Sequence, residues 1–299
     1  MSLPAVVREP GRRHEVDLPS AIVPYRAYGP VGDPEIVLVH GLRGDHHGLE
    51  PIVAHLTGRR VIVPDLPGFG EAPPLRRGEH DIDGYARVVT EMVDALAPGG
   101  VLLGHSFGSI IVAAAVAGGL DVRGLALVNP IAESGMVGPR RVVTGVTVGL
   151  HRLAAAVPER LGDGVLRSRV FTRVASVAMV KTRDRALRRW IHAEHDRWFG
   201  GYHDRRVLLE AFTASVTRGV TESAARIAVP TLLVGAELDD ITAPRQLHEL
   251  VALFPDARLE LIPGTGHLAH YETPHLVAQH VEAFVAGLPG GSALPGGPR

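Results

Sequence analysis

The sequence predicts an α/β fold, with a mostly parallel central sheet flanked by helices. Short apolar runs typical of buried strands alternate with helical stretches along most of the 299-residue chain. This alternation implies parallel strand pairing with right-handed crossover connections. A Gly-x-Ser-x-Gly sequence at 104–108 directly follows one apolar run and opens an alanine-rich helical stretch. We therefore expect a strand, a sharp turn and a helix, with Ser106 exposed in the turn.

Composition limits the class of protein. The chain is 45% apolar, which is enough for one large domain or two smaller ones. Its net charge of −1 gives no reason to expect binding to nucleic acid, and the absence of cysteine excludes disulfides, thiolate catalysis and cysteine-based zinc sites. The first 20 residues do not resemble a signal peptide, and no uncharged apolar run reaches the roughly 18 residues of a membrane helix. We therefore expect a cytoplasmic protein.

The elements before the serine turn follow from the hydrophobic pattern. Residues 1–20 are expected to form a polar lead-in, because they carry charges and no apolar segment. Helical periodicity over 81–96 predicts an amphipathic helix that ends at the sequence Pro-Gly-Gly. Apolar runs predict strands at 21–28, 35–40 and 60–65.

The serine turn places demands on its neighbours. A turn that exposes a serine between strand and helix crowds the backbone, and Gly104 and Gly108 supply the small residues it needs. The helix that starts beside Ser106 and runs to about 117 would direct N–H groups and the positive end of its dipole at the serine. A serine hydroxyl becomes a useful nucleophile only when a base takes its proton and donors stabilise the negative charge that forms.

The strand and helix alternation stops between residues 133 and 226. This segment contains helical stretches, for example at 142–157 and 184–199, and no clear strand. Its sixteen arginines and Lys181 against nine acidic residues give it a charge of about +8. One interpretation is a solvated helical surface, and the other is a cap that closes over a site and favours a substrate with an anionic group. An aromatic cluster in this segment is expected in the cap's own core or at its seam with the rest: Trp190, Trp198, Phe199 and Tyr202.

The alternation resumes after residue 226 and brings two further candidate residues to the site. A strand is predicted at 125–129, just before the helical segment. After the segment, strands are predicted at 230–235 and 258–263, helices at 244–254 and 274–288, and a disordered tail at 290–299. Asp239 and His267 follow the last two strands. Loops after parallel strands open on the same edge of a sheet, where Ser106 and the loop of His40, Gly41 and Leu42 also lie. The chain order is therefore Ser, Asp, His.

With these motifs in this order, the chain resembles the α/β-hydrolase superfamily over nearly its whole length. The resemblance implies a core made of 1–132 and 227–289, with a helical cap at 133–226 inserted after the sixth strand, and a tail at 290–299. The motifs that carry it are His40-Gly41, Asp65-Leu66-Pro67-Gly68-Phe69-Gly70, Gly104-His105-Ser106-Phe107-Gly108, Asp239 and Gly264-Thr265-Gly266-His267.

The resemblance also implies a role for each site residue. Ser106 would be the nucleophile, His267 the base that takes its proton, and Asp239 the acid that fixes the tautomer of the histidine. The backbone N–H groups of Leu42 and Phe107 would form the oxyanion hole.

Neighbouring residues compete for two of these roles. Asp240 adjoins Asp239, and Glu237 is near, but the family pattern of aspartate, any residue, aliphatic residue and small residue fits when Asp239 is the catalytic acid. His270 competes with His267, which directly follows the turn with two glycines.

Two other histidine positions have simpler interpretations. His40 in this family more often orders the oxyanion loop than performs chemistry. His46 and His47 are adjacent and have no third ligand at a useful spacing, so we interpret them as loop residues. We expect no metal and no cofactor.

A serine nucleophile limits the reaction. Relatives that resemble dehalogenases or epoxide hydrolases need a carboxylate at the position of Ser106. We predict hydrolysis of a carboxylic ester, lactone or thioester of small to medium size through an acyl-serine. A carbon–carbon bond hydrolase, an acyltransferase and a ligand-binding protein on the same fold are the alternatives. The expected partner is a small-molecule substrate, with an anionic group under the cap interpretation.

Overall fold

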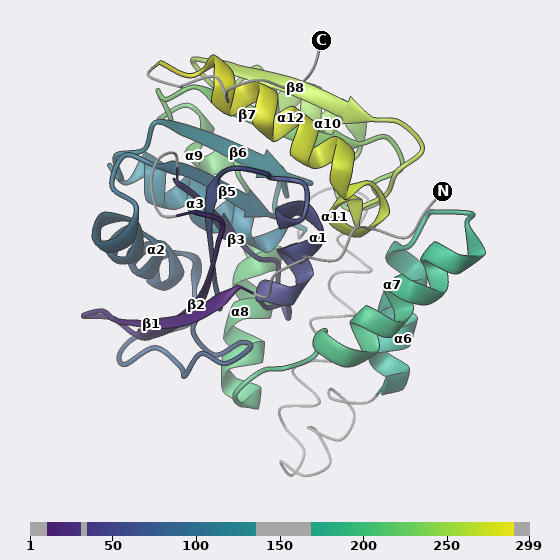
Figure 1. The fold of residues 1–299 in the computed structure, drawn as a ribbon, viewed down its shortest axis with the longest axis horizontal. Helices are drawn as coiled ribbons and strands as arrows, with labels where there is room; N and C mark the ends of the chain where they lie inside the picture. The colour runs from purple at the N-terminus through teal and green to yellow at the C-terminus, as the bar shows by residue number, and fades with distance from the viewer. Residues whose placement is uncertain (1–10, 31–34, 136–168, 290–299) are drawn as a thin grey trace.

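The computed structural model describes residues 11–30, 35–135 and 169–289. Its centre is an eight-stranded sheet with the strand order β1-β2-β4-β3-β5-β6-β7-β8 (Figure 1). The strands are β1 (Arg12–Asp17), β2 (Ile22–Tyr28), β3 (Glu35–Val39), β4 (Arg60–Pro64), β5 (Val101–His105), β6 (Gly124–Val128), β7 (Thr231–Ala236) and β8 (Ala257–Ile262).

Most strands of the sheet run parallel. The pairs β3–β4, β3–β5, β5–β6, β6–β7 and β7–β8 are parallel, while β2 pairs antiparallel with both β1 and β4. In the central pair, Ile36 lies beside Val101 and Val39 beside Gly104. The predicted α/β fold with a mostly parallel sheet is confirmed.

Helices cover both faces of the sheet because successive side chains of each buried strand point to opposite sides. Along β3, Ile36 and Leu38 pack in one apolar cluster, and Val37 and Val39 pack in another. The helices of the described residues are η1 (His46–Leu49), α1 (Glu50–Val53), α2 (Ile82–Leu96), α3 (Phe107–Ala117), α6 (Arg169–Met179), α7 (Arg185–Trp198), α8 (Arg205–Thr217), α9 (Thr221–Ala224), α10 (Pro244–Val251), α11 (Ala269–Glu272) and α12 (Pro274–Gly287).

Each face has its own set of helices. Helices α2 and α3 pack in the cluster of Val37 and Val39, whereas α1 and α12 pack in the cluster of Ile36 and Leu38. The sheet is thus buried on both faces, and its carboxyl edge remains for the site.

The prediction of a polar lead-in over residues 1–20 is wrong for 12–17. These residues form β1, an edge strand in which no residue is buried. Backbone pairing with β2 holds the strand in place. Because this pairing needs no buried side chains, the sequence of β1 has no hydrophobic pattern that would predict a strand. The helix predicted at 142–157 and the tail predicted at 290–299 lie outside the described residues.

The described part of the segment between β6 and β7 packs in two different ways. Helices α6 and α7 pack against each other, lie to one side of the sheet in Figure 1, and share a small cluster with the residues after β8. Helices α8 and α9 contribute Val207, Leu208 and Ala224 to a main core cluster, beside α2 and α3. The described helices of this segment are therefore divided between two clusters, and the cap boundaries at 133 and 226 stay a prediction.

None of the described helices is both long enough and apolar enough to cross a membrane.

Candidate active site

Ser106 lies at the junction between β5 and α3. Its backbone has φ 52° and ψ −118°, a conformation that few residues other than glycine adopt. A Cβ atom on Gly104 would lie 2.5 Å from the carbonyl oxygen of Gly108, and one on Gly108 would lie 2.4 Å from that of Val39. The turn therefore requires glycine at both positions, as the sequence predicts.

Ser106, His267 and Asp239 form a continuous chain of hydrogen bonds. The Oγ atom of Ser106 lies 2.8 Å from Nε2 of His267, and Nδ1 of His267 lies 2.8 Å from Oδ2 of Asp239. The three residues follow β5, β8 and β7, so the carboxyl edge of the sheet brings them together. With Nδ1–H donating to Asp239, Nε2 is free to accept the hydroxyl proton of Ser106.

Asp239 is held in place by three donors besides His267. Its Oδ1 accepts from the N–H of Ile241 at 2.7 Å and of Thr242 at 3.3 Å, and its Oδ2 accepts from Nδ2 of Asn129 at 3.0 Å. Burial raises the pKa of Asp239, but the charge of His267 and these hydrogen bonds outweigh burial, and the net effect lowers the pKa. Asp239 is thus an anion at neutral pH.

Asp240 has a different place. Its side chain is largely exposed and forms an ion pair with Nζ of Lys181. The structure therefore brings Asp239 rather than Asp240 to His267. The sequence analysis missed Asn129, whose signal is its position directly after β6, at the same edge of the sheet.

The two predicted oxyanion donors lie close to Ser106. Leu42 and Phe107 line one cavity together with Ser106. Phe107 is the first residue of α3, so its N–H has no acceptor within the helix. A Cβ atom on Gly41 would lie 3.3 Å from Cβ of Ser106, which shows how closely the loop of Leu42 approaches the serine turn.

His40 fixes this loop. Its Nε2 accepts from the N–H of Leu66 at 2.9 Å, so its Nδ1 carries the proton and donates to the carbonyl oxygen of Gly41 at 2.8 Å. Burial lowers the pKa of His40 and keeps the ring neutral. The geometry agrees with an ordering role for His40.

A sequence model of the Alpha/beta hydrolase family matches residues 36–280. The chain belongs to this family. It is 24% identical over 270 residues to the sn-1-specific diacylglycerol lipase ABHD11 of Mus musculus, with 85% of this chain and 81% of the relative covered. It is 26% identical over 269 residues to Lipase 1 of Psychrobacter immobilis, with 87% and 79% covered.

A thermophilic esterase from Thermogutta terrifontis has a similar fold. The two structures align with a TM-score of 0.73 over 91% of this chain and 97% of the esterase, at 20% sequence identity. At that identity the likeness concerns the fold alone.

In this alpha/beta hydrolase, a cavity of about 550 Å³ opens above Ser106. It lies between the carboxyl edge of the sheet and the helices α6 to α8. Most of its lining is apolar, and among the lining residues are Leu42, Ile131, Met179, Phe199 and Phe212. A cavity of this size accommodates a small to medium ligand.

The aromatic cluster predicted for the core or seam of the cap divides among three places, and Tyr202 is buried in a main core cluster. Trp198 stacks on the ring of His47 at 3.5 Å, and Trp190 meets the edge of Tyr271 at 5.5 Å, so both tryptophans lie at the seam with the core. Phe199 lines the cavity, which the sequence analysis did not anticipate.

Three buried histidines are part of the cavity lining. Burial first, and then the charge of His267, lowers the pKa of His105 to about 3. Burial and the charge of His192 lower that of His195, in α7, to about 4. His270 packs at 4.0 Å from the ring of His105, and its Nδ1 has no hydrogen-bond partner within the described part of the chain. The structure thus places His267, not His270, against Ser106.

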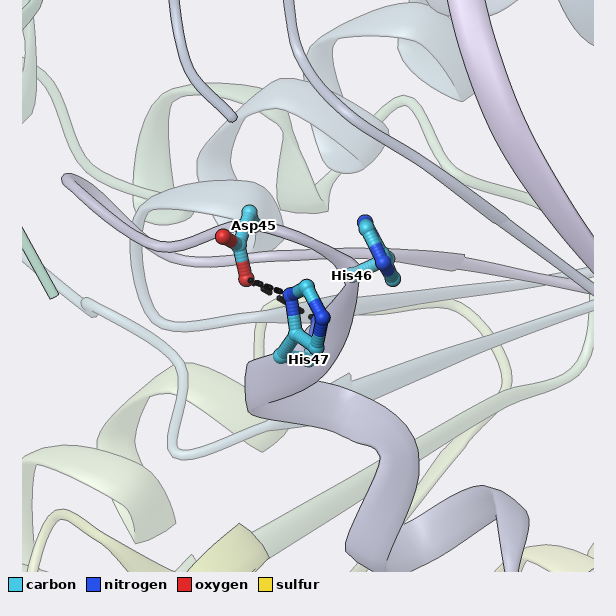
Figure 2. A group of neighbouring side chains, drawn as sticks. All are labelled: Asp45, His46 and His47. Carbon is cyan, nitrogen blue, oxygen red and sulfur yellow. Dashed lines mark hydrogen bonds and ion pairs between the residues drawn. The ribbon is translucent and has the colours of Figure 1, made fainter. Parts of the chain in front are cut away.

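Asp45, His46 and His47 form a compact group (Figure 2). Asp45 accepts from the backbone N–H of His47 and lies 3.1 Å from its Nδ1. His46 lies 2.9 Å from Asp65 through Nδ1 and accepts from Nε of Arg26 at 3.2 Å through Nε2. Asp45 is thus a third potential metal ligand beside the two histidines, which was not predicted from the sequence. The guanidinium group of Arg26 beside His46 disfavours a cation there.

Proposed function

We propose that this alpha/beta hydrolase is a serine hydrolase that cleaves a carboxylic ester, lactone or thioester through an acyl-serine intermediate on Ser106. The observation that supports this best is the chain of hydrogen bonds from Ser106 through His267 to Asp239 at the floor of an apolar cavity. The names of the two lipase relatives agree with the proposal.

In this mechanism, His267 takes the hydroxyl proton as Ser106 Oγ attacks the carbonyl carbon of the substrate. Asp239 stabilises the imidazolium that forms, and the N–H groups of Leu42 and Phe107 donate to the oxyanion. His267 then gives its proton to the leaving group. Water attacks the acyl-serine in the second half of the cycle, with His267 again acting as the base.

We propose that the described parts of 133–226 act as a cap over this site. Met179 at the end of α6, His195 in α7 and Phe199 after it line the cavity opposite Ser106. The described cavity wall carries the guanidinium of Arg43 but also the acidic residues Glu133 and Asp240, so these lining residues give the site no excess of positive charge. We therefore propose a substrate with a neutral acyl chain, and not the anionic group considered from the charge of the whole segment.

The test is a burst experiment with p-nitrophenyl esters of increasing acyl length, followed by mass spectrometry of the Ser106 peptide. We expect a burst and an acyl adduct in the wild type, and a loss of kcat of about 10⁴- to 10⁶-fold in Ser106→Ala. Ser215→Ala is the matched control, because Ser215 lines the same cavity but donates to the carbonyl of Phe212. An ester that carries a carboxylate on its acyl chain tests the preference for a neutral substrate.

The absence of a burst and of an adduct at every acyl length would overturn the proposal. An adduct that persists in Ser106→Ala would show that another residue is the nucleophile.

A further inference from the structure

Glu272 is a buried acid that the proposed mechanism does not use. It ends α11, five residues after His267, and its side chain is 4% exposed. Its Oε2 accepts from the N–H of Gly266 at 2.9 Å. Its Oε1 accepts from the N–H of Lys181 at 2.6 Å and of Thr182 at 2.9 Å. One carboxylate therefore joins the loop that carries His267 to the segment 180–183, which connects α6 with α7 and is called the hinge below.

Two further contacts fasten the hinge to the same region. Nζ of Lys181 pairs with Asp240, the neighbour of Asp239. A Cβ atom on Gly266 would lie 2.4 Å from Cγ of Lys181 and 3.1 Å from the carbonyl oxygen of Met179, so the hinge lies directly on the residue before His267. The base of the α6–α7 pair thus touches both loops that carry the partners of Ser106.

These contacts have a mechanical consequence. A buried carboxylate that loses hydrogen-bond donors pays a large desolvation penalty, so the arrangement favours keeping all three N–H groups around Glu272. Moving the hinge away from the sheet would remove two of the donors. Moving the loop of Gly266 would remove the third and displace His267 with it.

We propose that Glu272 is a positioning residue that couples the seating of the α6–α7 pair to the position of His267. With the hinge seated, the loop of Gly266 holds His267 within hydrogen-bond distance of Ser106. With the hinge displaced, that distance increases and proton transfer slows. This inference rests on the proposed function.

The first test is Glu272→Gln, which keeps the size of the side chain. The amide has one acceptor oxygen, whereas the three N–H groups around Glu272 are bound by two carboxylate oxygens. The readouts are kcat and KM for p-nitrophenyl acetate and p-nitrophenyl octanoate, with active sites counted by titration with a phosphonate. We expect kcat per active site to fall about 10- to 100-fold on both esters, because a displacement of about 1 Å has an effect of this size. The matched control is Glu282→Gln, in α12, whose carboxylate accepts from Nε of Arg59 at 2.6 Å.

A second test separates positioning from folding stability. Gly266→Ala forces the hinge and the loop of His267 apart, and we expect it to lower kcat on both esters. Lys181→Ala in the same chain removes the Cγ atom that the new methyl group meets, so the double variant should regain part of the lost kcat. Lys181→Ala alone provides the reference.

Three results would overturn the inference. The first is a kcat per active site in Glu272→Gln within about twofold of the wild type. The second is a change confined to KM for the octanoate, which would mean that Glu272 only shapes the cavity. The third is no recovery in the double variant. A wild type that forms no acyl-Ser106 would instead overturn the proposed function, and titration with the phosphonate distinguishes that case.

Discussion

The two walls of the cavity are built in different ways. At the carboxyl edge of the sheet, backbone geometry fixes the groups that we propose to react: Ser106 lies in a strained strand-to-helix turn, and two backbone N–H groups hold Asp239. The α6–α7 pair is attached to the core mainly by side chains, such as Trp198 on His47 and Lys181 on Asp240. The geometry of the reaction therefore depends on local chain conformation, whereas the shape of the cavity depends on contacts between distant segments.

The largest expected difference between the walls is in kcat, and substitutions at the two adjacent acids Asp239 and Asp240 measure it. Asp239→Asn should lower kcat by about 10⁴-fold, because an amide facing Nδ1 stabilises the wrong tautomer of His267. Asp240→Asn removes a pair whose acid is exposed and should change kcat by less than about fivefold. Steady-state kinetics on one ester measures both, and a larger loss in Asp240→Asn would reverse the assignment of the acid.

Two buried leucines test whether the walls unfold together. Leu103→Ala, in β5, should lower the free energy of unfolding by about 2–5 kcal/mol. Leu187→Ala, in α7, should lower it less and raise KM more, because the α6–α7 pair can detach while the sheet stays folded. Urea unfolding followed by circular dichroism, together with kinetics, measures both effects. Equal losses of stability would show that the two walls unfold as one cooperative unit.

Substitutions at two glycines test how tightly the backbone of each wall is constrained. Gly108→Ala places a methyl group 2.4 Å from a backbone oxygen of β3, which should cost about 1–3 kcal/mol of stability and shift the N–H of Phe107. The methyl group of Gly201→Ala, between α7 and α8, meets no atom of the described residues within 4 Å, and the variant should stay within about 0.5 kcal/mol of the wild type. Thermal unfolding and kcat check the pair, and a tolerated Gly108→Ala would mean that the turn is less constrained than its contacts indicate.

At neutral pH the smallest expected effect is that of His105 and His195, whose contribution to the pH dependence of stability appears only as the pH falls. Both have a pKa below the ordinary value of 6.5, at about 3 and about 4, so the unfolded chain binds protons that the folded protein does not. Their contribution to stability is complete above pH 6.5 and is lost as the pH falls towards these values, at up to about 1.4 kcal/mol per pH unit for each group.

Unfolding measured from pH 6 to pH 4.5 checks this dependence. His105→Gln should reduce the slope of the free energy of unfolding against pH. Protonation of His195 should loosen the α6–α7 pair and raise KM at low pH, and His195→Gln should reduce that rise. An unchanged slope in His105→Gln would contradict the prediction.

The sequence predicted the sheet edge well, since its signals are local. The apolar runs mark the strands, Gly104 and Gly108 mark the turn, and Asp239 and His267 directly follow strands. The catalytic roles of these residues, the cap boundaries and the cytoplasmic location stay predictions. By contrast, the edge strand β1 has no hydrophobic pattern to mark it.

The residues that the sequence analysis missed act through long-range contacts. Asn129 donates a hydrogen bond to Asp239, 110 positions away, and Glu272 accepts one from the N–H of Lys181, 91 positions away. Charge likewise failed to separate α8 from α7, although α8 packs in a main core cluster and α7 does not. Only the folded arrangement reveals these partners.

The contacts of Glu272 with the hinge also bear on how this family can diversify. The groups that Glu272 accepts from are backbone N–H groups, which every residue except proline supplies. These hydrogen bonds, unlike the ion pair of Lys181 with Asp240, therefore place little demand on the identity of the side chains at 181 and 182. We therefore expect that different helices can be attached at this point, so that the substrate range changes while the proposed reacting groups at the sheet edge stay the same.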